Sequence, residues 1–110
     1  MKPAQMTNEE IMELFRQCLP LFAVLNDEKR QEIILIVADA KEEGIMVNAI
    51  TEKVSLSRPA VSHHLKILRQ AGIVDVKKKG VESYYYLTLL DSVTRFKELL
   101  AAIENSCILV

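Results

Sequence analysis

The sequence predicts one mainly α-helical domain with a small β-hairpin, an α+β arrangement of four helices, two strands and a last helix. Three observations lead to this class. The chain has 110 residues, which suits a single domain spanning residues 1–110, and half of them are hydrophobic. Apolar residues recur with the helical period through most of the chain. After Gly72 the period changes to two, which is typical of strands.

The first two helices are expected over residues 8–19 and 27–41. Thr7 and Glu10 form a capping-box pattern, and the apolar stripe after it is expected to stop near Pro20 because proline interrupts a helix. Asn26 is expected to cap the second helix. The inward face of this second helix is expected to carry Ile33, Ile34, Ile36, Val37 and Ala40.

Two shorter helices are expected over residues 48–54 and 58–71, joined by a three-residue turn. Asn48 can cap the first of them, and Pro59 suits the first turn of the second. The alternating residues after Gly72 predict a hairpin over about 73–89 with a basic tip, in which Tyr85 and Leu87 face the core. A last helix is expected over 91–105.

Charge is distributed unevenly along the chain. Residues 53–79 carry seven basic side chains and one acidic side chain, whereas residues 1–52 carry ten acidic and five basic ones. The formal net charge of −1 excludes a uniformly basic nucleic-acid coat but leaves room for a local basic face. A charge run of this kind is also typical of an ordinary solvated surface.

The two short helices and their turn match a helix-turn-helix, whose second helix reads DNA in the major groove. A helical projection of residues 58–71 places Val61, His64, Leu65 and Leu68 inward, with His64 expected to be a hydrogen-bonded structural residue. Polar and basic residues face outward, and three lysines follow at the hairpin, where a wing would contact the backbone or minor groove. The predicted DNA contacts are Ser57, Arg58, Pro59, Ser62, His63, Lys66, Arg69, Lys77, Lys78 and Lys79.

The run from Leu56 to Val74 resembles the recognition helix and first wing strand of the ArsR/SmtB family of bacterial winged-helix repressors. It contains the pattern Val-Ser-x-His-Leu-x-x-Leu-x-x-Ala-Gly-Ile-Val, and the resemblance extends over residues 22–105. It implies a winged helix-turn-helix and a homodimer built through the first and last helices. It also implies a double-stranded DNA operator with approximate two-fold symmetry and repression that a signal relieves. Val81 stands where the family often has a wing-tip arginine.

Neither of the family's common metal sites is retained. Met46 and Asn48 occupy the positions of a Cys-x-Cys pair, so they offer no thiolate. The second site matches Asp91, Val93, Glu104 and Cys107, which contain no histidine. No metal and no cofactor is expected, although whether the altered second site binds anything stays open.

Cys18 and Cys107 fall on the apolar stripes of the first and last helices. Free cysteine is among the most buried residue types, so packing in the core or at a dimer interface is the first interpretation. A thiol sensor is the alternative, because the two stripes would meet in a dimer. The inducing signal, and whether there is one, stays open.

Two other classes of function compete with DNA binding. A winged-helix protein-interaction module without specific DNA binding is the main alternative. No Gly-rich phosphate loop or nucleophile motif is present, so an enzyme is not expected. Because the sequence has no signal-peptide pattern and no apolar run of membrane-spanning length, a cytoplasmic protein without membrane contact is expected.

Overall fold

A computed structural model describes residues 6–106 of the chain. The predicted order of four helices, a two-stranded hairpin and a last helix is confirmed, with one additional 3-10 turn. The elements are α1 (Asn8–Leu25), α2 (Glu28–Asp39), η1 (Lys41–Glu43), α3 (Val47–Lys53), α4 (Arg58–Gln70), β1 (Val74–Lys79), β2 (Glu82–Leu87) and α5 (Leu90–Ser106). None of the helices in this part of the chain is long and apolar enough to cross a membrane.

Helix α1 continues past Pro20, so the predicted end at residue 19 is wrong. The capping box at its start is present, with the Thr7 hydroxyl accepting a hydrogen bond from the Glu10 backbone N–H. Proline removes one helical hydrogen bond, which costs about 3 kcal/mol in a helix interior. Leu21 and Val24 lie beyond Pro20 and are buried, and their burial offsets this cost.

Two predicted helix caps are also wrong. The side chain that caps α2 is Asp27, whose Oδ1 accepts a hydrogen bond of 3.0 Å from the Arg30 N–H, whereas Asn26 ends α1. Helix α3 begins at Val47, and the residue at its N-cap, Met46, makes no side-chain capping bond. Helix α2 ends at Asp39, two residues before the predicted end, because the chain turns into η1.

The hairpin pairs β1 with β2 in an antiparallel register that matches Val76 with Tyr85. Ile45 adds an isolated bridge on the outer edge of β2, where its N–H and C=O bond the backbone of Tyr85 at 2.9 and 2.8 Å. Gly44 precedes this bridge with φ 80°, and a side chain there would meet the Tyr85 carbonyl oxygen at 2.8 Å. Glycine at residue 44 therefore lets the two segments approach closely.

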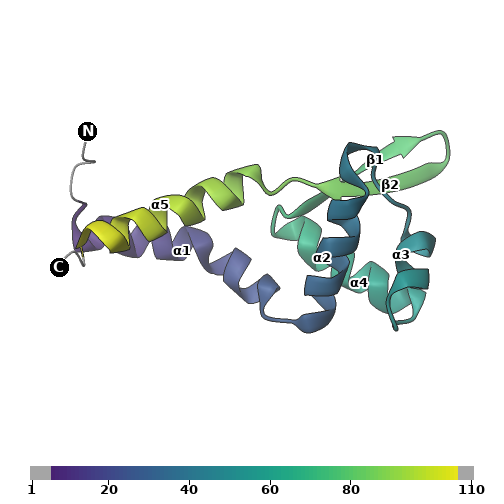
Figure 1. Cartoon of the computed structure of the whole chain (residues 1–110), viewed down its shortest axis with the longest axis horizontal. Coiled ribbons are helices and arrows are strands. Elements are labelled where there is room, and N and C mark those ends of the chain that lie inside the picture. Colours follow the sequence, from purple (N-terminus) through teal and green to yellow (C-terminus); the bar gives the residue numbers. More distant parts are fainter. Residues whose placement is uncertain (1–5, 107–110) are drawn as a thin grey trace.

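Two hydrophobic clusters hold the molecule together. The larger one joins α2, α3, α4 and the hairpin around fully buried side chains that include Ile33, Ile50 and Leu68. Ile34, Ile36 and Tyr85 are partly buried against it. The smaller cluster lies between α1 and α5, and Figure 1 shows this helix pair extending away from the rest of the molecule. The molecule is therefore elongated, with extents of 52 × 25 × 21 Å.

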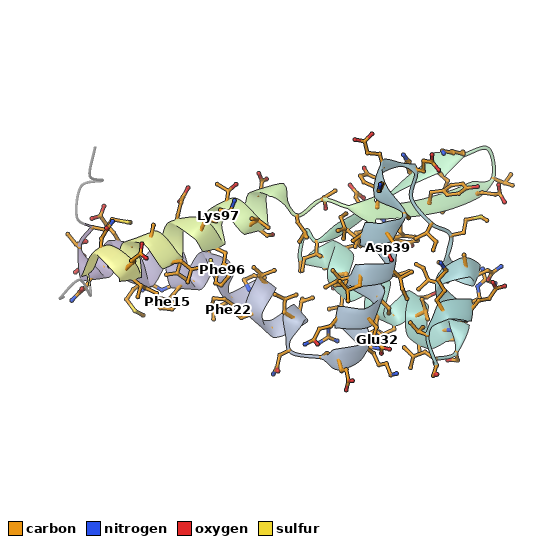
Figure 2. The ribbon with its side chains drawn as sticks, viewed as in Figure 1. Phe15, Phe22, Glu32, Asp39, Phe96 and Lys97 are labelled. Carbon is orange, nitrogen blue, oxygen red and sulfur yellow. The ribbon has the colours of Figure 1, made fainter. Side chains whose placement is uncertain are left out.

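Aromatic packing joins α1 to α5. Figure 2 shows Phe22 and Phe96 between these two helices, with ring centroids 5.6 Å apart and ring planes at 80°. Edge-to-face pairs of this kind are favourable because of the ring quadrupoles. The pair links the projecting helices near the point where they leave the winged-helix body.

Candidate nucleic-acid interface

Helices α3 and α4 form the helix-turn-helix, with α4 as its second helix. The Ser57 hydroxyl caps α4 by accepting a hydrogen bond of 3.3 Å from the Ala60 N–H, and Pro59 lies in the first turn. Val61, Leu65 and Leu68 are buried in the larger cluster, as the projection predicts. These three side chains fix the rotation of α4, and hence which residues it presents to solvent.

The outward face of α4 is polar and largely unengaged. The side chains of Arg58, Ser62 and Lys66 are exposed and make no hydrogen bond or ion pair with any other residue between 6 and 106. His63 is exposed too, with its ring centroid 6.1 Å from that of His64. This face therefore offers several free donors on a rigid helix, which suits recognition of phosphates and base edges.

His64 differs from the prediction. Its side chain is half-buried, as the inward projection implies, but its Nδ1 atom is buried without a hydrogen-bond partner among residues 6–106. The expected hydrogen bond is therefore missing at this nitrogen. His64 acts electrostatically on the capping carboxylate of Asp27, whose pKa is lowered mainly by the Arg30 backbone N–H and also by His64.

Arg69 lies at the end of α4 and is engaged by the hairpin. Its Nε donates a hydrogen bond of 3.1 Å to the Asp75 carboxylate in β1, and both side chains are exposed. The sequence-based set of site residues does not include Asp75. Asp75 could have been recognised as a partner for a basic side chain, because it is the one acidic residue in the basic segment 53–79.

The three hairpin lysines have different surroundings. The Lys77 ammonium donates a hydrogen bond to the backbone carbonyl of Glu42 in η1, and it lies 5.3 Å from the centroid of the Tyr86 ring. Lys79 is exposed, with its ammonium 4.8 Å from the centroid of the Tyr84 ring. Lys78 is exposed on the other face of the strand. Strand alternation places Lys77 and Lys79 on one face with both tyrosines, and each ammonium lies over the tyrosine diagonally across the hairpin, not over the residue directly opposite.

A cleft separates the start of α4 from the hairpin. It has a volume of about 370 Å³ and is lined by Arg58 on one side and Val81 on the other, among other residues. Val81 is 94% exposed at the hairpin tip. The start of the second helix and the hairpin tip therefore flank one surface, as a reader helix and its wing do.

The described residues that could bind a signal lie on α1 and α5. Cys18 is 2% exposed within the α1–α5 cluster, which supports packing, and Cys107 lies outside the described residues. In α5, Asp91 and Glu104 are exposed and Val93 is half-buried. Within residues 6–106 no group of three or more histidine, cysteine or carboxylate side chains could hold a metal ion.

Comparison with known proteins agrees with this architecture. The family model for "Bacterial regulatory protein, arsR family" matches residues 27–76. An uncharacterized HTH-type transcriptional regulator from Methanocaldococcus jannaschii is 33% identical over 95 residues, which cover 86% of this chain and 99% of that protein. The transcriptional repressor SdpR from Bacillus subtilis is 33% identical over 67 residues, covering 61% of this chain and 71% of SdpR.

A solved structure shows the same fold. It is the homodimeric winged helix-turn-helix DNA-binding domain of a possible ArsR-family transcriptional regulator from Mycobacterium bovis. The two chains are 20% identical and align with a TM-score of 0.65 over 94% of each. The sequence matches cover both the helix-turn-helix and nearly the whole length of the archaeal relative. The chain belongs to the ArsR family of bacterial regulatory proteins.

Proposed function

We propose that the protein is a homodimeric, sequence-specific repressor that binds a two-fold symmetric DNA operator in the cytoplasm. The observation that carries this proposal is the outward face of α4. Its exposed donors at Arg58, Ser62, His63 and Lys66 have no ion-pair partner among the described residues, whereas its inward face is locked into the core. A helix with an exposed polar face and a buried apolar face suits the major groove, which is wide enough to admit it.

Each residue of this face has a distinct expected role. Ser62 and His63 lie in the first two turns of α4, where a reader helix contacts base edges. Arg58 suits a guanine or a phosphate, and Lys66 suits a phosphate. Ser57 and Pro59 set the start of the helix, so their contribution is to position it.

The hairpin acts as the wing in this proposal. Lys78 and Lys79 are exposed beside the tip, where they would pair with backbone phosphates. Arg69 and Lys77 contribute less directly, because each already has an intramolecular partner. Those partners hold the wing against α4 and η1, so both residues would orient it.

The second copy would cover the α1–α5 pair. Leu19 on α1 is 56% exposed and Leu100 on α5 is 50% exposed, although the pair already packs on its inner side. Large apolar side chains exposed on a projecting helix pair mark an interaction surface. A dimer joined there keeps the hairpins at the far ends of the molecule, and its two-fold axis would be mirrored in the operator.

Salt dependence of DNA binding tests the proposal. Removing one cation that neutralises a phosphate should reduce the slope of log Kobs against log salt by about one. Arg58→Ala and Lys66→Ala should each do so in fluorescence anisotropy titrations with duplex DNA. Lys97→Ala is the matched control, because Lys97 is an exposed cation on α5, away from α4 (Figure 2). Equal slopes for all three variants and the parent would rule out α4 as the DNA-binding face.

A further inference from the structure

A cleft beside the hairpin lies outside the outward face of α4 and the α1–α5 surface, and Lys77 is the residue that it shares with the predicted DNA contacts. It has a volume of about 660 Å³, is open to solvent, and is bordered by the end of α2, by η1 and by the hairpin. Volumes of roughly 300–1,000 Å³ are usual for small-molecule sites, which combine apolar walls with a few polar groups. Both features are present in this cleft.

The apolar part of the cleft is built by α2 and β2. Val37 is fully buried at its base, with Ala38 and Leu87 beside it. The half-buried ring of Tyr86 forms an aromatic wall. A flat apolar body can therefore pack between the helix and the strand.

The polar part of the cleft is mainly cationic. Lys41 and Lys77 line it together with a single carboxylate residue, Glu42. The Lys77 ammonium lies inside the cleft, where it donates a hydrogen bond to the Glu42 backbone carbonyl beside the Tyr86 ring. Lys41 has φ 54°, a left-handed conformation that is uncommon for residues other than glycine, and it is an exposed residue of the cleft lining.

We propose that this cleft binds a small aromatic carboxylate. The ring would pack against Leu87 and Tyr86, and the carboxylate would accept hydrogen bonds from Lys77 and Lys41. A carboxylate is a stronger partner for an ammonium than a neutral carbonyl oxygen is. The ligand carboxylate therefore replaces the Glu42 carbonyl as the partner of Lys77.

This exchange would alter how the hairpin is held. Two connections join it to the segment between α2 and α3, namely the Lys77–Glu42 hydrogen bond and the paired bonds between Ile45 and Tyr85. The ligand removes the first and leaves the second. Lys78 belongs to the same strand as Lys77. Binding of the ligand in the cleft would therefore change how firmly the wing, and with it Lys78, is held. This regulatory consequence rests on the proposed DNA-binding function, whereas the site itself does not.

Ligand binding is tested without DNA, by ¹H–¹⁵N correlation spectra of the full chain during titration. Three probes separate the two parts of the cleft: benzoate, benzamide of the same shape without charge, and acetate of the same charge without the ring. Benzoate should shift the amide signals of Val37, Ala38, Glu42 and Leu87 at the lowest concentration. Equal titration by acetate, or no benzoate shift at these amides, would overturn the proposal.

Lysine variants test the assigned partner. Lys77→Met should weaken benzoate binding about tenfold, the effect expected from removing a charge-assisted hydrogen bond. Lys78→Met removes the neighbouring charge on the opposite face of β1 and should leave benzoate affinity unchanged. Lys41→Met should also lower the affinity for benzoate, because Lys41 is the second lysine assigned to the carboxylate. Equal benzoate affinities for Lys77→Met and Lys78→Met would contradict the site, whatever either variant does to DNA.

Discussion

The Nε atom of Arg69 lies 3.1 Å from Oδ1 of Asp75, which joins the end of α4 to the first strand of the hairpin. The same carboxylate oxygen accepts a hydrogen bond of 2.8 Å from the Val76 N–H. Asp75 therefore links the reader helix to the wing, and it places a negative charge beside the proposed DNA surface.

Replacing Asp75 by Asn should strengthen DNA binding. The variant keeps Oδ1 as an acceptor but removes the negative charge, so Arg69 is held less strongly and can neutralise a phosphate. The slope of log Kobs against log salt should become steeper by about 0.9 in anisotropy titrations. The free energy of unfolding should change by less than about 1 kcal/mol, because the ion pair is exposed. A slope that stays the same would show that Arg69 lies out of reach of the DNA.

The α1–α5 surface predicts where a charge should break the dimer. Leu19→Glu puts a carboxylate in the middle of the proposed interface and should shift the protein from dimer to monomer in sedimentation-velocity experiments. Leu35→Glu is the matched control, since Leu35 is 66% exposed on α2, outside the helix pair. If both variants sediment like the parent protein, α1 does not form the interface.

The close approach at Gly44 predicts a large difference between two glycine substitutions. Gly44 has φ 80° and ψ 179°, a region essentially restricted to glycine, and a Cβ there would lie 2.8 Å from the Tyr85 carbonyl oxygen. Gly44→Ala should therefore reduce the free energy of unfolding by about 3 kcal/mol or more. Gly80→Ala should cost only about 1–2 kcal/mol, because φ is 66° but nothing lies within 4 Å of the added carbon. Urea denaturation measures both, and equal losses would contradict the close approach.

The cap of α2 predicts a pH dependence of stability. The Arg30 backbone N–H lowers the pKa of Asp27 in the folded protein. A lowered folded-state pKa contributes stability that is fully present above the unfolded value, about 3.9, and is lost as the pH falls through the folded value. Asp27→Asn should therefore flatten the loss of stability below about pH 4. Thermal melts from pH 2 to 7 measure this, with Asp39→Asn at the other end of α2 as the control. If the stability of Asp27→Asn falls with pH as that of the parent protein does, other carboxylates cause the loss of stability.

Much of the fold could be predicted because burial and periodicity coincide. Val61, Leu65 and Leu68 lie on one stripe in the sequence and are buried together in the structure. The ends of the helices were harder to predict, because they depend on the balance between local backbone costs and the burial of apolar side chains. Pro20 predicts a helix end, but the apolar stripe continues through it to Leu21, and burial decides the outcome.

The exposed residues of the site could be predicted, but their partners could not. Helical projection shows that Arg58 and Lys66 face outward, whatever surrounds them. Lys77 instead meets the backbone of Glu42, 35 residues earlier in the chain, through the packing of η1 against the hairpin. Contacts of that kind follow from tertiary structure, so three consecutive lysines that look equivalent in the sequence differ in their surroundings.

Selection from random duplex DNA tests the central claim most directly. The purified full chain should enrich an inverted repeat whose half-sites lie about 10 base pairs apart or a multiple of this, because two copies of α4 would enter successive major grooves. Ser62→Ala and His63→Ala should relax the preference at individual positions, by about 1–3 kcal/mol for each base contact. Enrichment of such a repeat by the parent chain, and a weaker base preference at individual positions in these variants, is the predicted result. Recovery of no motif by the parent chain would contradict sequence-specific binding and favour a protein-interaction module.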